Sequence, residues 1–180
     1  MRLFVAVPLP DSTRAALAMW SQGCGPLPAL RWTPPEQLHI TLQFLGEVAD
    51  DRVHRVAEAL DGIALAAFTV VLERLEVLRR AGVLAVAARP APEMSSLAGE
   101  VRARLASFIE DPEEREFRPH VTLARARRGA SVPNPRTFPP LPPLEFTPGC
   151  FRLYRSQTRP EGAVYTVMRE WPLARSSAQS

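Results

Sequence analysis

Two of the three histidines in this 180-residue chain occur in the same pattern, His-x-Thr-Leu. One copy, HITL, begins at His39, and the other, HVTL, begins at His120. With this threonine and leucine content, the pattern follows a given histidine by chance in roughly 0.6% of cases, so two copies among three histidines are expected on the order of once in ten thousand sequences. Even after a tenfold or larger allowance for choosing the pattern afterwards, the repetition indicates a shared role.

Alternate side chains of a β-strand point to the same face. If each motif is a strand, His39 and Thr41 share one face, and His120 and Thr122 repeat that arrangement. The intervening isoleucine, valine and leucine residues then face a core on the opposite side. Threonine is β-branched and suits a strand by itself, but that preference does not account for the histidine that recurs with it.

Several roles are open to a pair of His-x-Thr segments. A metal site needs further ligands from elsewhere, because neither motif contains Cys, Asp or Glu. Buried structural histidines are a second alternative. A nucleophilic serine is disfavoured because the chain lacks a Gly-x-Ser-x-Gly turn. General acid–base catalysis by two imidazoles requires only what the motifs already contain.

Two opposed imidazoles suit in-line displacement at phosphorus. One neutral imidazole takes a proton from the attacking water, and an imidazolium on the other side gives a proton to the departing alkoxide. The two threonine hydroxyls can donate hydrogen bonds to the nonbridging oxygens, where negative charge develops. The pattern therefore favours phosphoester chemistry without a metal.

The elements that must position the motifs repeat in each half of the chain. Hydrophobic patterning predicts helices and strands in the order strand 3–9, helix 11–21, strand 38–45, helix 51–60, hairpin 68–78 with 82–89, helix 92–109, strand 117–127 and hairpin 150–158 with 163–171. The segment 30–37 is expected to be extended, and the proline-rich segment 133–148 is expected to be a loop. This order predicts an α+β fold of two pseudo-symmetric lobes, with antiparallel sheets facing a central cleft and helices outside.

The charges are unevenly distributed along the chain. All 22 basic residues are arginine; residues 1–117 hold 12 of them against 16 acids, whereas residues 118–180 hold 10 against 3 acids. The cationic C-terminal third suggests an anionic partner such as phosphate, although a solvated arginine-rich surface is an equal alternative. No apolar run reaches the roughly 20 residues of a membrane span. Cys24 and Cys150 form no redox or metal motif, so we expect a cytoplasmic protein without required disulfides.

The motifs resemble those of the two-histidine (2H) phosphoesterase superfamily. The segments RWTPPEQLHITLQFLGEV, FRPHVTLAR and LYRSQTRPEGAVYTV are similar to its RNA 2′,3′-cyclic phosphodiesterase branch, also called 2′-5′ RNA ligases. The resemblance implies a single domain over residues 1–180 made of two interleaved lobes, each contributing one His-x-Thr-Leu strand. It also implies a hydrolase that opens RNA 2′,3′-cyclic phosphate ends to 2′-phosphates, and reversible 2′-5′ RNA ligation as a further activity.

The same resemblance assigns roles to residues. His39 is expected to be the proton donor and His120 the proton acceptor, with Thr41 and Thr122 binding phosphate. No metal and no cofactor is implied. RNA ends or nucleotides with a 2′,3′-cyclic phosphate are the expected partners, with no membrane, no obligate protein partner and a monomeric state. A non-catalytic RNA-end-binding module is the alternative function.

Two further residues conflict with simple strand alternation. The resemblance makes Arg125 a phosphate contact, but it lies five residues after His120 and would face away in a regular strand, so a bulge or the strand end must redirect it. Phe44, a candidate for stacking on a base, lies on the Ile40 face unless the strand twists or ends there. His54 falls in the predicted helix 51–60 and is expected on the surface.

Overall fold

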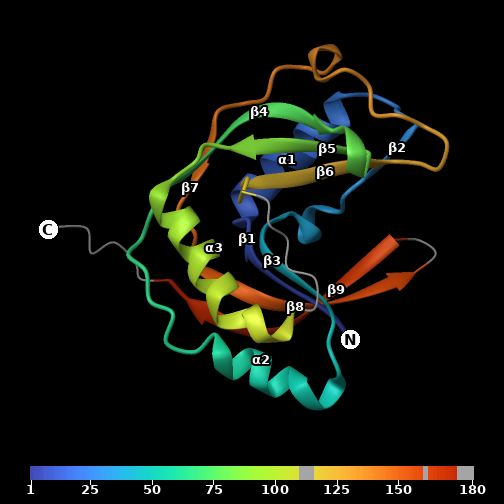
Figure 1. Ribbon diagram of the computed structural model, residues 1–180. Coiled ribbons are helices and arrows are strands. Elements are labelled where there is room, and N and C mark those ends of the chain that lie inside the picture. The colour runs from blue at the N-terminus through green and yellow to red at the C-terminus, as the bar shows by residue number, and fades with distance from the viewer. Residues whose placement is uncertain (110–115, 160–161, 174–180) are drawn as a thin grey trace, which may run out of the picture.

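The computed structural model describes residues 1–109, 116–159 and 162–173. Within these ranges an antiparallel sheet has the strand order β7-β4-β5-β6-β3-β1-β8-β9, with β2 paired to β6 (Figure 1). The strands are β1 (Arg2–Pro8), β2 (Leu30–Trp32), β3 (His39–Glu47), β4 (Val70–Leu78), β5 (Val83–Ala88), β6 (His120–Ala126), β7 (Leu144–Phe146), β8 (Cys150–Arg159) and β9 (Gly162–Pro172). The α-helices are α1 (Asp11–Gly23), α2 (Val53–Ala59) and α3 (Pro92–Leu105).

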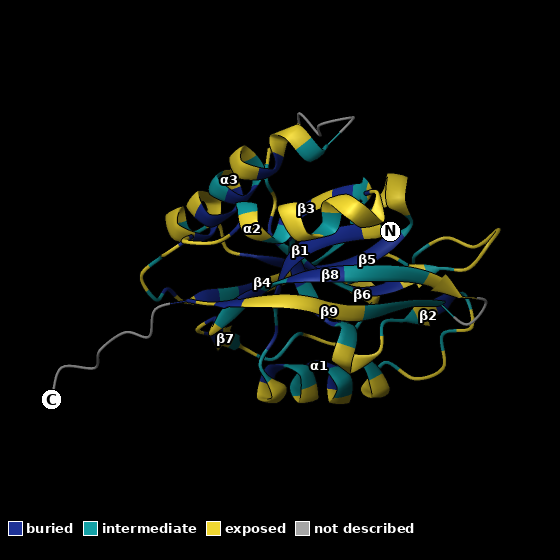
Figure 2. Cartoon of the chain, turned by 90° about the horizontal axis from the view of Figure 1, so that it is seen from below, coloured by how far each residue is buried: buried dark blue, intermediate teal, exposed yellow. Residues whose placement is uncertain are grey.

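The sheet consists of two halves of four strands, β7-β4-β5-β6 and β3-β1-β8-β9. They meet where β3 runs antiparallel to β6, and Ile40 and Val121 are the residues of these two strands that pair directly. The α+β fold with antiparallel strands is therefore confirmed, and the two lobes share one continuous sheet. Figure 2 shows this sheet between α1 on one side and α2 with α3 on the other.

Alternation along β1 divides the interior into two clusters. Leu3, Val5 and Val7 are buried in the main core, which includes residues of α1 and α3. Phe4 and Ala6, on the opposite face of the strand, are buried in a smaller cluster with Tyr154. Each fully buried aliphatic side chain contributes about 1.5–3 kcal/mol, so both faces of β1 hold the sheet in place.

Helix α3 shows how the sequence specifies the outer layer. Pro92 occupies the first helical turn, where a missing N–H costs nothing. The buried side chains recur at helical spacing and are Met94, Leu97, Ala98, Val101 and Leu105. The predicted helix 92–109 is shorter than expected, because a 3-10 turn replaces it at Ala106–Phe108.

Two short strands were not predicted. The expected loop 133–148 contains β7, in which Phe146 pairs with Val70 of β4. Prolines flank β7, and they are tolerated because β7 is an edge strand and needs hydrogen bonds on one side alone. In the expected extended segment 30–37, β2 pairs with the end of β6. No helix in the described part of the chain is long and apolar enough to cross a membrane.

Candidate active site

The two His-x-Thr segments lie side by side at the centre of the sheet. Because Ile40 pairs with Val121 in antiparallel register, His39 falls next to Thr122 and Thr41 next to His120. The four polar residues line one cavity of about 1300 Å³. The structure therefore brings together the histidines and threonines predicted from the sequence, on adjacent strands and not on opposite walls of the cleft.

Both imidazole rings are fixed in the same way. Nδ1 of His39 lies 2.6 Å from the carbonyl oxygen of Gln37, and Nδ1 of His120 lies 2.8 Å from that of Arg118. A carbonyl oxygen only accepts hydrogen bonds, so Nδ1 carries the proton in each ring. In a neutral ring this leaves Nε2 as an acceptor, and Nε2 of His39 lies 3.1 Å from the hydroxyl oxygen of Thr41.

Burial changes the acidity of one histidine. Removal from water lowers the pKa of His39 from 6.5 to about 4; the hydrogen bond to the Gln37 carbonyl opposes this, and the positive charges of His120 and Arg125 lower the pKa further. The ring of Phe4 packs against it, with centroids 5.0 Å apart. In the ligand-free protein His39 is thus neutral at pH 7, so a proton-donor role requires a bound anion to raise its pKa.

A β-bulge redirects Arg125. In the pairing of β5 with β6, Ala85 opposes Thr122 and Leu84 opposes Ala124, so Leu123 is an extra residue. Leu123 and Ala124 are both buried, and Arg125 returns to the exposed side, where it lines the cavity. The bulge, one of the two conditions expected from the sequence, places Arg125 on the face of His120.

The same irregularity occurs in β3. Thr41 pairs with Ala6 and Gln43 with Val5 of β1, so Leu42 is the extra residue. Leu42 and Gln43 are both buried, and Phe44 is 57% exposed and lines the cavity. The placement of Phe44 on the core face by simple alternation is therefore wrong, since the bulge shifts the alternation by one residue.

Sequence reasoning missed Gln43, a buried polar residue. Its side-chain nitrogen donates to the carbonyl oxygen of Phe44 at 2.7 Å, and its side-chain oxygen accepts from Nε of Arg102 at 3.4 Å. These contacts hold the bulged backbone and connect it to α3. The signal available in the sequence was a polar residue, Gln43, within the hydrophobic segment that follows HITL.

Sequence reasoning also missed Tyr165 of β9. Its ring lies edge-on to that of His39, with centroids 5.5 Å apart, and lines the cavity. The side chain of Gln37 donates to the carbonyl oxygen of Ala163 at 2.9 Å, which fixes β9 beside the His39 strand. His54 is exposed in α2 and does not line the cavity, as expected.

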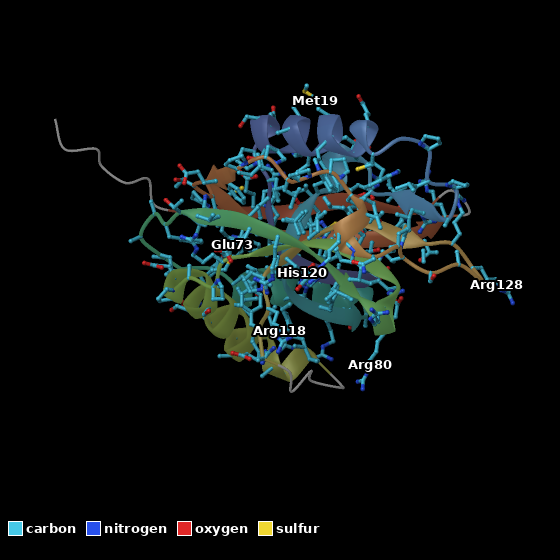
Figure 3. The ribbon with its side chains drawn as sticks, turned by 90° about the horizontal axis from the view of Figure 1, so that it is seen from above. Met19, Glu73, Arg80, Arg118, His120 and Arg128 are labelled. Carbon is cyan, nitrogen blue, oxygen red and sulfur yellow. The ribbon has the colours of Figure 1, made fainter. Side chains whose placement is uncertain are left out.

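The cavity is strongly cationic. Of the residues that the structure describes, seven arginines and two glutamates line it; they are Arg31, Arg79, Arg80, Arg102, Arg118, Arg125 and Arg159, with Glu76 and Glu116. Figure 3 shows His120 near the middle of the molecule, with Arg118 below it and Arg80 at the lower edge. Among the described residues, no three His, Cys, Asp or Glu side chains gather as a metal site requires. The arrangement suits an anionic ligand beside two imidazoles.

Known proteins are similar to this chain in sequence. Residues 9–160 match the family described as the 2′-5′ RNA ligase superfamily. The chain is 34% identical to the RNA 2′,3′-cyclic phosphodiesterase of Thermus thermophilus, over 96% of this chain and 90% of that protein. It is 30% identical to the RNA 2′,3′-cyclic phosphodiesterase of Escherichia coli K12, over 96% of each chain.

Solved structures share the fold. TT0787 of Thermus thermophilus superposes with a TM-score of 0.82 at 32% identity, over 98% of this chain and 100% of that one. Escherichia coli LigT in complex with 3′-AMP gives a TM-score of 0.79 at 28% identity, over 96% and 97%. LigT structures with ATP and with NADP+ also match. The sequence match and these structures confirm the resemblance inferred from the two motifs: the chain belongs to the 2′-5′ RNA ligase superfamily.

Proposed function

We propose that the protein hydrolyses RNA 2′,3′-cyclic phosphate ends to 2′-phosphates, with His39 and His120 as the proton-transfer pair. The observation that carries this proposal is the pairing of the two motif strands at Ile40 and Val121, which sets two backbone-anchored imidazoles beside two threonines in one cavity. The enzyme class agrees with the names of the relatives in Thermus thermophilus and Escherichia coli.

The proposed reaction is a single displacement at phosphorus. A water oxygen forms a bond to phosphorus while the bond from phosphorus to O3′ breaks. The acceptor imidazole, His120, takes the proton from water, and the donor imidazole, His39, gives a proton to O3′. The product is a 2′-phosphate with a free 3′-hydroxyl, and the two rings end with their protonation states exchanged.

The remaining side chains of the site have electrostatic roles in this proposal. The hydroxyls of Thr41 and Thr122 donate to the nonbridging oxygens, which gain negative charge in the transition state. Arg125, turned into the cavity by its bulge, adds a fixed positive charge that lies on the same face as His120. Phe44 offers an exposed ring on the other strand for a nucleobase.

Turnover of an RNA oligonucleotide with a 2′,3′-cyclic phosphate end, in the presence of EDTA, tests the reaction. We expect a 2′-phosphate product and a loss of at least roughly 10²-fold in kcat for His39→Ala and for His120→Ala, the scale of general acid–base catalysis. His54→Ala is the matched control, because His54 is exposed and outside the cavity. Near-full activity in either active-site variant refutes the assignment of the two histidines as the proton-transfer pair.

The donor and the acceptor can be distinguished by the leaving group. A substrate with sulfur in place of the bridging O3′ leaves as a thiolate, whose conjugate acid has a pKa near 8.5, so it does not need a proton. We expect this substrate to restore turnover in His39→Ala and not in His120→Ala. The reverse pattern makes His39 the acceptor, and binding without any turnover in the unsubstituted protein favours the RNA-end-binding module.

A further inference from the structure

One end of the cavity carries arginines that the proposed reaction does not use. They come from β2, from the turn between β4 and β5, and from the end of β8, and we name them the arginine rim: Arg31, Arg79, Arg80 and Arg159. All four surround the end of the cavity marked by Arg125. Arg125 of β6 pairs with a residue on each side. On one side its partner is Arg31 of β2, and on the other side its partner is Val83, which follows the turn between β4 and β5.

The fourth member is brought to the rim by the β8–β9 hairpin. Arg159 pairs with Gly162, and a Cβ added to Gly162 would lie 3.6 Å from a guanidinium nitrogen of Arg31. The guanidinium of Arg31 therefore lies beside the residue that pairs with Arg159.

The positive charges of the rim arginines are unpaired within the described part of the chain. Within the described residues, the side chains of Arg31, Arg79, Arg80 and Arg159 form no ion pair and no hydrogen bond. Arginines elsewhere on the surface do find carboxylates, as Arg152 does with Glu170 at 2.6 Å. Like charges held together at one mouth repel each other and attract an anion.

The turn of the rim is too far from the histidines to touch the reacting phosphate. His120 pairs with Ala87 and Arg125 pairs with Val83, and the four residue-to-residue steps from Ala87 to Val83 span about 13 Å of strand. The turn with Arg79 and Arg80 lies beyond Val83, and Figure 3 shows Arg80 at the end of the sheet, away from His120. An anion held there is separate from the one at the histidines.

We propose that the arginine rim binds backbone phosphates of the RNA strand on the 5′ side of the terminal cyclic phosphate, so that the protein prefers oligonucleotide ends to mononucleotides. This inference rests on the proposed function for the identity of the ligand as RNA. Guanidinium groups pair with phosphate oxygens through two parallel hydrogen bonds. Contacts to the backbone carry no sequence information, so the preference is for length and not for sequence.

The test compares two substrates that share their terminal nucleotide, a 2′,3′-cyclic mononucleotide and a tetranucleotide ending in it. The measured quantity is the ratio of kcat/KM for the tetranucleotide over that for the mononucleotide. An exposed ion pair contributes roughly threefold and at most about fivefold, and two such factors multiply, so Arg79→Ala/Arg80→Ala should lower this ratio by roughly tenfold. Arg55→Ala/Arg136→Ala, the matched control, removes the same charge from exposed positions outside the cavity and should leave the ratio unchanged.

The role of the rim can also be tested by binding alone, so that the test does not depend on catalytic activity. The affinity of a tetranucleotide ending in a 2′-phosphate is measured at several salt concentrations. Each phosphate contact on a single strand contributes roughly 0.7 to the slope of log affinity against log salt, so the rim variant should lose about 1.4 and the control nothing.

The outcomes separate the two proposals. A wild-type protein that turns over neither substrate refutes the proposed function, and the salt slopes still decide the rim. Equal turnover of both substrates by the wild type, equal losses on both in the rim variant, or an unchanged slope overturns the rim and leaves the hydrolytic function intact. A lower ratio and a lower slope in the rim variant alone support it.

Discussion

Binding of a phosphate should return a proton to His39. In the ligand-free protein, desolvation holds its pKa at about 4 instead of 6.5. The difference corresponds to about 3 kcal/mol against the charged ring. At pH 7 roughly one ring in a thousand is therefore protonated, and the proposed donor has no proton to give before the substrate arrives.

The charge of the ligand is large enough to reverse this. A unit negative charge 4 Å from the ring stabilises the imidazolium by about 4 kcal/mol at the effective dielectric constant of a protein site, close to 20. This exceeds the cost of about 3 kcal/mol from burial and from the neighbouring positive charges. We therefore expect a bound nucleoside 2′-monophosphate to raise the pKa of His39 back to at least its ordinary value of 6.5.

Proton NMR of the ring carbons measures this directly, because the chain has three histidines. His54→Ala and His120→Ala assign their own signals, and the remaining one belongs to His39. Titration without ligand should give a pKa of about 4 for His39. A ligand-free value near 6.5 refutes the effect of burial, and a value that stays near 4 with the ligand bound refutes the donor role and makes His39 the acceptor.

The same lowered pKa predicts how stability depends on pH. As the pH falls below 6.5, the unfolded chain protonates His39 while the folded protein does not, so the free energy of unfolding decreases until the pH reaches about 4. The total loss is about 3 kcal/mol. His39→Gln should lack this part of the acid dependence, and denaturant unfolding at pH 7, 5.5 and 4 compares the two proteins. If the free energy of unfolding falls equally with pH in both proteins, the contribution of His39 is refuted.

Substitutions at four other residues test the site and its support. Thr41→Val and Thr122→Val should each lower kcat by roughly 10²-fold with little change in binding of the 2′-phosphate product, since the hydroxyls act on charge in the transition state; an equal loss of product binding contradicts this. Phe44→Ala should raise KM for a cyclic nucleotide by roughly tenfold, whereas Phe44→Tyr keeps it, as base stacking contributes about 1–3 kcal/mol. Asp61→Ala should lower the melting temperature without affecting turnover, because it removes the carboxylate that accepts from the indole N–H of Trp171 at 2.8 Å and pairs with Arg169 at 2.6 Å; an unchanged melting temperature would exclude this role.

Short-range patterns were sufficient for the helices and long strands. Proline at the start of α3 and buried residues at 3–4 spacing have local causes. The strand β7 could not be predicted in this way, because its Leu144–Phe146 segment is short and lies among prolines, and its pairing with β4 is a long-range contact. The adjacency of the two motif strands is also long-range, and strand alternation alone is compatible with opposed walls.

The site residues likewise fall into those that a local pattern predicts and those that depend on long-range strand pairing. The repetition of His-x-Thr identified the four polar residues without any structure, since period-two alternation holds for the first four positions of each motif. It fails at the fifth position because a bulge depends on the partner strand, which is β1 for Leu42 and β5 for Leu123. The pairing therefore had to be known before Phe44 and Arg125 could be placed.

The two bulges lie at equivalent positions of the two motif strands, so the backbone of the site is pseudo-symmetric. The side chains that follow the bulges differ. Phe44 and Arg125 occupy equivalent positions, five residues after His39 and His120, and both reach the cavity. The β3 half continues from Phe44 into an aromatic cluster around Phe4, whereas the β6 half continues from Arg125 into the arginine rim. A nearly symmetric pair of imidazoles gives a cyclic phosphate no preferred direction. The apolar residues beside β3 and the arginines beside β6 differ, and this difference can orient the substrate. In the proposed complex the base lies over β3 and the RNA backbone leaves along β6.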